Sequence, residues 1–167
     1  MRRLSGNPEV DYDAEVAASE WKNSDRNAAI AHFLRSHGNL LCDVDEVLDL
    51  YFHQCALKMS CHDLAKTLIP LANQGAGLTG NRHELHPRRV KRINSLMLTC
   101  GVYDAAGNFA FRVGIPCKSG VGGGIVGVIP NYLAVCVWSP ELDTAGNSYV
   151  GTRALELFTT KTGLSIF

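Results

Sequence analysis

The chain has 167 residues, enough for one ordinary domain, and its 46% hydrophobic and 19% charged residues exclude a disordered, coiled-coil or collagen-like chain. Its 16 basic and 16 acidic residues cancel to a formal net charge of zero. A neutral chain has no overall field to attract nucleic acid or an anionic membrane, so we expect neither as a partner.

The first hundred residues carry helical patterns. We predict helices over residues 11–22, 24–36 and 43–57, a fourth over 60–75 and a fifth from Pro87 through Met97. Ser24 and Ser60 suit N-cap positions, Gly38 suits a helix end, and Pro87 suits a first helical turn. Residues 75–85 are predicted to form a loop.

The character of the sequence changes at Gly101. Strands are predicted over residues 108–113, 124–129 and 133–138, and their short connections indicate an antiparallel meander. Because these strands are apolar on both faces, we expect helices on each side of the sheet. A last helix is predicted from Ser148 to about Thr162. The fold class is α+β, in a single domain over 1–167 that is mainly helical in 1–100.

The uncharged stretch over residues 119–140 raises the question of a membrane segment. Gly122, Gly123 and Gly124 interrupt it at one end and Pro130 divides it, so neither piece is long enough to span a bilayer as a helix. The N-terminal residues lack the apolar core of a signal peptide, and the six cysteines form no C-x-x-C pair. We therefore expect a cytoplasmic protein without a membrane segment, with most thiols buried as small hydrophobes.

Lys118, Ser119 and Gly120 precede a predicted strand. On a sheet edge, such a tripeptide can direct a lysine and a hydroxyl to a site, while the glycine admits a ligand closely. The backbone N–H of the next residue, Val121, can then form half of an oxyanion hole. Taken alone, the tripeptide is better explained as a basic turn before a strand.

Several longer segments match one known family in register. They are residues 94–104, 109–124, 137–143 and 146–148, together with the upstream segments 24–27 and 48–52. The sequence closely resembles the C-terminal half of the glutaminases, the serine-dependent amidohydrolases with a β-lactamase/transpeptidase-like fold. The resemblance implies a partial version of that fold, with a helical subdomain, a three-stranded antiparallel meander and a terminal helix.

The resemblance implies roles for three residues in the first third of the chain. Glu20 would bind the α-ammonium group of the substrate, Asn27 its α-carboxylate, and Tyr51 would line the substrate site. The charges agree, since a carboxylate suits an ammonium group and an amide donor suits a carboxylate. Without the resemblance, these residues would be a helix-end glutamate, a first-turn asparagine and a core aromatic.

Further roles follow for the second half of the chain. Tyr103 resembles the catalytic tyrosine that contacts the substrate and relays a proton, and the Val121 N–H would bind the amide oxygen. Lys118 would keep the site positive, with Ser119 and Gly120 in support. The alternatives are a loop tyrosine packed on the sheet and a lysine in a structural ion pair.

The implied reaction is hydrolysis of L-glutamine to L-glutamate and ammonia through a γ-glutamyl-serine intermediate. The family serine belongs to a Ser-x-x-Lys motif at a helix start, and the lysine one turn later acts as the base. The resemblance implies no cofactor and no metal, and it implies a homo-oligomer.

The sequence departs from the family in one respect. The Ser-x-x-Lys helix should lie well before residues 25–27, yet the chain's one such string, at residues 19–22, overlaps Glu20 and is interpreted as coincidence. Cys117 is a candidate low-pKa thiol beside Lys118, but its family position is not the nucleophile. We therefore expect a partial glutaminase that lacks its nucleophile segment, with an exposed sheet edge and poor solubility in isolation.

Two other interpretations stay open. In the first, the chain is a catalytically inactive remnant that acts as a binding or subunit-assembly module. In the second, it is a β-lactam-binding module built on Lys118–Gly120. The expected binding of an amino acid by Glu20 and Asn27 argues against a β-lactam as the ligand. His83 and His86 are too few for a metal site, and the basic run at 88–92 indicates a solvated face or a subunit contact.

Overall fold

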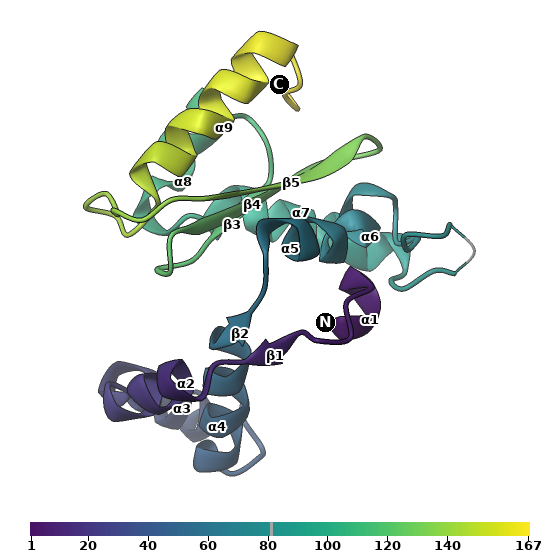
Figure 1. The fold of residues 1–167 in the computed structure, drawn as a ribbon. Helices are drawn as coiled ribbons and strands as arrows, with labels where there is room; N and C mark the ends of the chain where they lie inside the picture. The colour runs from purple at the N-terminus through teal and green to yellow at the C-terminus, as the bar shows by residue number, and fades with distance from the viewer. Residues whose placement is uncertain (81) are drawn as a thin grey trace. The chain divides into compact units, whose positions relative to one another are not determined.

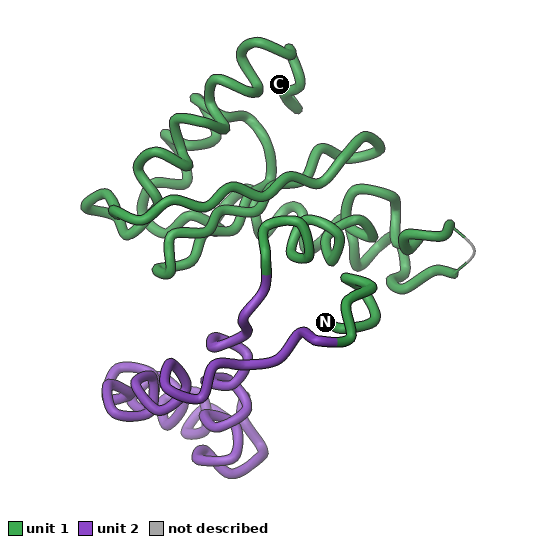
Figure 2. The backbone as a smooth tube through the Cα atoms, viewed as in Figure 1, with its two compact units in different colours: residues 1–8, 60–167 green, residues 9–59 purple. Residues whose placement is uncertain are grey.

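A computed structural model describes residues 1–80 and 82–167. Its internal contacts divide the chain into two compact units (Figure 2). Unit 1 comprises residues 1–8 and 60–167, and unit 2 comprises residues 9–59. The assignment of a single domain to residues 1–167 stays a prediction.

Unit 2 is built from three helices and a short ladder. The helices are α2 (Ala14–Lys22), α3 (Asp25–Ser36) and α4 (Val44–Cys55), close to the predicted ranges. Strands β1 (Asp11–Tyr12) and β2 (Leu57–Lys58) pair antiparallel, a ladder that was not predicted because two residues show no periodicity. The buried residues of its hydrophobic core are Ala31, Val44, Leu48 and Phe52.

The capping residues of unit 2 differ in part from the prediction. Asp13 and Asp43 cap α2 and α4, since each side chain accepts hydrogen bonds from two backbone N–H groups of its helix. Ser24 lies at the N-cap of α3 as predicted, but its side chain makes no capping hydrogen bond.

The helices of unit 1 include one correction. The helix predicted over residues 60–75 is two helices, α5 (Cys61–Thr67) and α6 (Ile69–Ala72). Ser60 caps α5 in a reciprocal capping box with Asp63. Pro70 has no N–H to continue the α5 ladder, which explains the break. The remaining helices of this unit are α1 (Arg2–Ser5), α7 (Pro87–Cys100), the 3-10 turn η1 (Tyr103–Ala105), α8 (Ala106–Arg112) and α9 (Tyr149–Thr162).

The predicted loop over residues 75–85 falls partly outside the described residues, because it includes Asn81. On either side of that residue the chain turns back on itself, and Ala76 forms an antiparallel bridge with His83.

The sheet of unit 1 is an antiparallel meander of three strands, as predicted, but one of the three is formed by a different segment from the one predicted. It contains β3 (Cys117–Ser119), β4 (Gly124–Ile129) and β5 (Leu133–Trp138) in the order β3-β4-β5. The strand predicted over residues 108–113 is wrong, because this segment is helix α8. Phe109 and Val113, four residues apart, are buried, whereas Phe111 between them is 88% exposed. That spacing is helical, although the apolar alternation indicated a strand.

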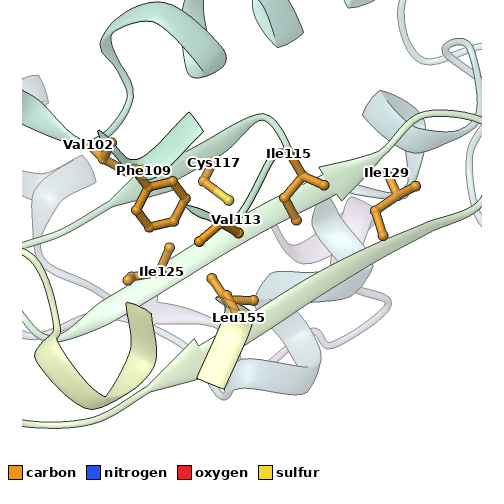
Figure 3. Packing of buried hydrophobic residues seen from close by; sticks show 8 residues of the cluster. All are labelled: Val102, Phe109, Val113, Ile115, Cys117, Ile125, Ile129 and Leu155. Carbon is orange, nitrogen blue, oxygen red and sulfur yellow. The ribbon is translucent and has the colours of Figure 1, made fainter. Parts of the chain in front are cut away.

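Strand β4 is buried on both faces. Ile125 and Ile129 pack with Phe109 of α8 and Leu155 of α9 (Figure 3), whereas Val128 packs with α6 and α7. Figure 1 shows α8 and α9 on one side of the sheet and α5, α6 and α7 on the other. The expected cover on both faces is therefore confirmed. The strand order leaves β3 and β5 at the edges of this sheet, and the low solubility expected from an edge stays a prediction.

Candidate active site

Tyr103 lies just beyond the end of α7 in an uncommon backbone conformation. Its φ is +54°, in the left-handed region that costs a residue with a side chain about 1–3 kcal/mol. Such conformations persist where the surroundings determine them, and they cluster at functional sites. The side chain is 41% exposed, so the phenol can be reached by a small molecule.

Lys118 of β3 stands over the Tyr103 ring. Its Nζ lies 4.8 Å from the ring centroid, a distance at which an ammonium group is attracted to the face of an aromatic ring. Lys118 Nζ also donates a hydrogen bond to the Ser119 carbonyl. The structure therefore brings together a phenol and a cation that are fifteen residues apart in the sequence.

Ser119 and Gly120 continue from Lys118. Ser119 is 2% exposed; its N–H donates to the Gly101 carbonyl at 3.0 Å, and its hydroxyl lies 3.5 Å from the same oxygen. The hydroxyl is thus turned to the end of α7 rather than to solvent. These contacts tie β3 to the segment that carries Tyr103.

The turn between β3 and β4 presents Val121. Gly120 N–H donates to the Gly124 carbonyl at 2.9 Å, and Gly123 N–H to the Gly120 carbonyl at 3.0 Å. Trp138 Nε1 fixes the same turn by donating to the Gly122 carbonyl at 2.8 Å. Val121 is 65% exposed, and within residues 1–80 and 82–167 its N–H donates no hydrogen bond. It is a donor in a fixed turn, as an oxyanion site requires.

The remaining predicted site residues belong to unit 2. Glu20 lies near the end of α2 and Asn27 in the first turn of α3, and both are half-buried. In the part of the chain that the structure describes, neither side chain makes a hydrogen bond or an ion pair. Half-buried polar groups with no protein partner remain available to a ligand.

Tyr51 of α4 also lies in unit 2. It is exposed, and its ring centroid lies 5.7 Å from that of Phe52, the residue that fills the core. The interpretation of Tyr51 as a core aromatic is therefore wrong, because the neighbouring ring takes the buried position.

One polar residue near Tyr103 received no role from the sequence. Asn147 is buried, and its Nδ2 donates to the Val102 carbonyl at 3.2 Å. Gly146, its neighbour, lies against the Tyr103 ring. The segment 146–148 carried the family resemblance, but burial of an asparagine in a loop has no sequence periodicity that would reveal it.

Neither alternative nucleophile is supported. Burial raises the pKa of the Cys117 thiol far above its ordinary value, so the interpretation of Cys117 as a low-pKa thiol is wrong. The string at residues 19–22 lies at the end of α2, where the Ser19 carbonyl accepts the Asn23 N–H. The family motif, by contrast, is placed at a helix start.

The described residues contain no group of three or more histidine, cysteine, aspartate or glutamate side chains placed to hold a metal ion. In the same residues, no helix has both the length and the apolar character that crossing a bilayer would require.

Comparison with known proteins places the chain in a family. The glutaminase family model matches residues 1–167. The chain is 55% identical to the glutaminases of Vibrio cholerae and Aeromonas hydrophila over all of its length, and it covers 55% of each of them. The chain thus spans about half the length of these curated relatives.

Solved structures give the same result. The chain superposes on a probable glutaminase of Bacillus subtilis with a TM-score of 0.92 and 33% identity, covering 99% of this chain and 56% of that one. Another structure, of the Bacillus subtilis protein complexed with 6-diazo-5-oxo-L-norleucine, gives a TM-score of 0.93 and 34% identity, with 99% and 56% coverage. The predicted partial β-lactamase-like fold is confirmed, and the chain belongs to the glutaminase family.

Proposed function

We propose that this chain supplies part of the active site of an amidohydrolase that converts L-glutamine to L-glutamate and ammonia. The observation that carries the proposal is the contact between the strained Tyr103 and Lys118, next to the available Val121 N–H. These are an acid–base group, a cation and an oxyanion donor, which acyl transfer needs around its reacting carbonyl.

The acylation step would use these groups together. A serine from a Ser-x-x-Lys segment gives its hydroxyl proton to the lysine of that motif and attacks the side-chain carbonyl carbon, and the carbonyl oxygen takes up negative charge that the Val121 N–H stabilises. Tyr103 delivers a proton to the departing nitrogen, which leaves as ammonia. The Lys118 ammonium group, 4.8 Å from the ring, favours the negative charge that the phenol then carries.

Hydrolysis of the ester would complete the cycle. Water attacks the γ-glutamyl ester and gives a proton to the Tyr103 oxygen, while the serine recovers its own proton through the lysine base of its motif. L-glutamate leaves, and all protons are accounted for by side chains and water. The reaction as written needs no cofactor.

Substrate selection is assigned to unit 2. Glu20 pairs with the α-ammonium group, the Asn27 amide donates to the α-carboxylate, and Tyr51 lines the site. Their half-buried or exposed positions support this assignment. The structural neighbour complexed with 6-diazo-5-oxo-L-norleucine supports L-glutamine as the substrate, because that amino acid has a carbonyl at carbon 5, as L-glutamine does. We also propose that the protein forms a homo-oligomer in the cytoplasm and that nucleic acid is not among its partners.

A second candidate is an inactive remnant that retains only the binding part of the site. The observation that favours it is coverage, because the chain spans 55% of its curated relatives and its only Ser-x-x-Lys string ends a helix. Such a chain would bind L-glutamine or join other subunits without turning the substrate over.

Ammonia release from L-glutamine separates the two candidates. We would assay the purified chain alone and mixed with a polypeptide that comprises the part of Vibrio cholerae glutaminase it does not cover. We expect release in the mixture, reduced about 10²-fold or more by Tyr103→Phe because a general acid contributes that much. Tyr132→Phe, an exposed tyrosine on the turn after β4, is the matched control.

The other outcomes are equally clear. Equal rates for the mixtures with Tyr103→Phe and with the unchanged chain would overturn the role of Tyr103. Glutamine binding without release in the mixture would establish the remnant. Release by the chain alone that disappears in Tyr103→Phe would mean that another nucleophile serves, with Ser19 the first to replace.

A further inference from the structure

The segment between β5 and α9 is braced by its own hydrogen bonds. Asp143 Oδ1 accepts the N–H groups of Ala145 and Asn147, each at 2.9 Å. The Asp143 N–H donates to the Asn147 carbonyl at 2.8 Å, and the Gly146 N–H donates to the Asp143 carbonyl at 3.0 Å. Ser148 then caps α9. A turn held in this way presents the Asn147 side chain in a fixed position.

Asn147 reaches from this turn to the residue before Tyr103. Its side chain is 1% exposed, and its Nδ2 donates to the Val102 carbonyl at 3.2 Å. That carbonyl belongs to the peptide group between Val102 and Tyr103, whose orientation is coupled to the φ of Tyr103. The Ala105 N–H donates to the same oxygen at 3.3 Å, so two donors fix it.

The same turn also runs beside the ring of Tyr103. Gly146 has a φ of +88°, and a Cβ built on it would lie 3.8 Å from two atoms of the Tyr103 ring. Asn147 therefore holds the backbone, while the glycine beside it leaves room for the ring. Lys118 Nζ lies over the same ring.

Asn147 is an energetically unfavourable residue at a buried position. Its Oδ1 has no hydrogen-bond partner among the described residues, and a buried polar atom left unpaired disfavours the folded state. An apolar side chain would avoid that loss. The presence of the amide is explained if its N–H donor determines the orientation of the Val102–Tyr103 peptide group.

We infer that Asn147 is a positioning residue for Tyr103. Its amide holds the Val102–Tyr103 peptide group in the orientation that gives Tyr103 its left-handed conformation and places the phenol ring under Lys118. The inference rests on the proposed function, since the group that it positions is the proposed catalytic acid, but it can be tested without turnover.

Nuclear magnetic resonance on the 167-residue chain gives the test. The ring current of Tyr103 should shift the ε-methylene protons of Lys118 upfield, and Tyr103→Leu supplies the unshifted reference. We expect Asn147→Ala to move these protons to the reference position while the methyl shifts of Ile125 and Leu155 in the core stay unchanged.

Asn94 provides a matched control in the same unit. It too is a buried asparagine, 9% exposed, whose Nδ2 donates to a backbone carbonyl, that of Leu71, at 3.0 Å, and whose Oδ1 has no partner among the described residues. Asn94→Ala should therefore leave the Lys118 protons upfield. Upfield protons retained in folded Asn147→Ala would overturn the inference.

A measurement on the unchanged chain protects the test against variants that fail to fold. We expect a scalar coupling across the hydrogen bond between the Asn147 side-chain nitrogen and the Val102 carbonyl carbon. Its absence would equally overturn the inference.

Kinetics separate the inference from the proposed function. In the reconstituted assay we expect Asn147→Ala to lower kcat on the order of tenfold to hundredfold, as misplacement of a catalytic group by an ångström does. The KM should change less than kcat, because the α-ammonium and α-carboxylate groups of the substrate are proposed to bind Glu20 and Asn27 in unit 2. Equal rates for Tyr103→Phe and the unchanged chain would overturn the proposed catalytic role of Tyr103 and leave the resonance result standing.

Discussion

At the scale of single residues, Gly101 sets how closely helix α7 approaches strand β3. A Cβ on this residue would lie 1.8 Å from the Cys117 carbonyl oxygen and 2.4 Å from that of Met97. Neither oxygen can move without shifting backbone. Gly101 therefore permits the hydrogen bond from Ser119 N–H to its carbonyl, which joins the segments that carry Tyr103 and Lys118.

We expect Gly101→Ala to lower the free energy of unfolding by about 3 kcal/mol, the upper end for overpacking. Gly107→Ala is the matched control, because Gly107 lies in α8 and its added Cβ would meet nothing within 4 Å. That variant should gain about 0.5–1 kcal/mol from higher helix propensity. Urea denaturation followed by circular dichroism measures both, and equal stability of the two variants would contradict the close approach.

The cysteines should differ in reactivity according to their burial. Cys117 is buried, which raises the pKa of its thiol, whereas Cys42, Cys55, Cys61 and Cys100 are exposed. Burial, and next a hydrogen bond with Cys61, raises the pKa of Cys136 to about 12. We expect iodoacetamide at pH 8 to alkylate the four exposed thiols first and Cys117 only after denaturation. Mass spectrometry of the peptides checks this order, and early labelling of Cys117 would refute it.

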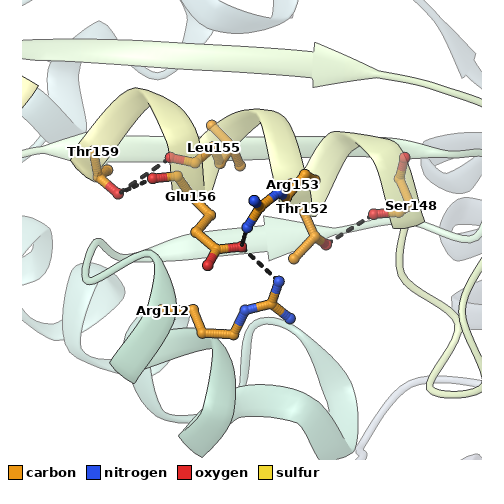
Figure 4. Close-up of polar contacts among 7 residues, drawn as sticks. All are labelled: Arg112, Ser148, Thr152, Arg153, Leu155, Glu156 and Thr159. Atoms are coloured by element: carbon orange, nitrogen blue, oxygen red, sulfur yellow. Dashed lines mark hydrogen bonds and ion pairs between the residues drawn. The ribbon is translucent and has the colours of Figure 1, made fainter. Parts of the chain in front are cut away.

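At the scale of elements, an ion-pair cluster joins α8 to α9 (Figure 4). Glu156 Oε2 lies 2.5 Å from Arg112 Nη2 and 2.9 Å from Arg153 Nη1. The hydrogen bonds from Arg112, and next from Arg153, hold the pKa of Glu156 below its ordinary value of 4.5. The cluster connects two helices that cover the same face of the sheet.

This depressed pKa predicts a pH-dependent contribution to stability. A carboxylate whose pKa is lower in the folded state stabilises that state above its ordinary pKa, and the contribution disappears as the pH falls through the folded value. The stability difference between the unchanged chain and Glu156→Gln should thus be largest near pH 7 and shrink below pH 4.5. Denaturation midpoints between pH 7 and 3 test this. A stability difference that stayed constant from pH 7 to pH 3 would contradict the prediction.

The elements also show where sequence patterns are ambiguous. Helix α9 and strands β4 and β5 were predicted from periodicity within a few residues of their observed bounds. The alternation of Phe109, Phe111 and Val113 with other residues indicates a strand, although the segment is helix α8. Seven residues contain too few periods to separate a spacing of 2 from one of 3.6, so the buried partners of Phe109 and Val113 decided the outcome.

At the scale of the whole molecule, the two units have separate hydrophobic cores. The core of unit 2 centres on Phe52, which is fully buried and packs edge-on against Trp21 at a centroid distance of 5.2 Å. The cores of unit 1 lie on the two faces of β4. A unit with its own core can lose its structure by itself.

We therefore expect Phe52→Ala to destabilise residues 9–59 selectively. Loss of a buried phenylalanine costs about 3–5 kcal/mol, whereas Leu50→Ala at an exposed position of the same helix should cost about 0.5 kcal/mol or less. Hydrogen exchange read by mass spectrometry should show lost protection in residues 9–59 and retained protection in β4 and α9. Simultaneous loss throughout the chain would show that the two units unfold together.

The sequence by itself determined the family, most helices, two of the three strands of the antiparallel meander and the types of residue that the chemistry needs. Long runs of matched residues and sustained periodicity are properties of the chain, and they need no tertiary contact to be recognised. Glu20, Asn27, Tyr51, Tyr103 and Val121 could all be named in this way, although their roles stay proposals.

Only the tertiary structure decided which groups meet. Lys118 lies over the Tyr103 ring, and Asn147 donates to the Val102 carbonyl, so both contacts join segments distant in sequence. They surround Tyr103, whose φ is positive. The burial of Cys117, which removed it as a nucleophile, also depends on β4 packing beside it. The physical reason is common to all of these. Burial and contact are set by the arrangement of elements in space, and a local pattern contains no information about distant neighbours.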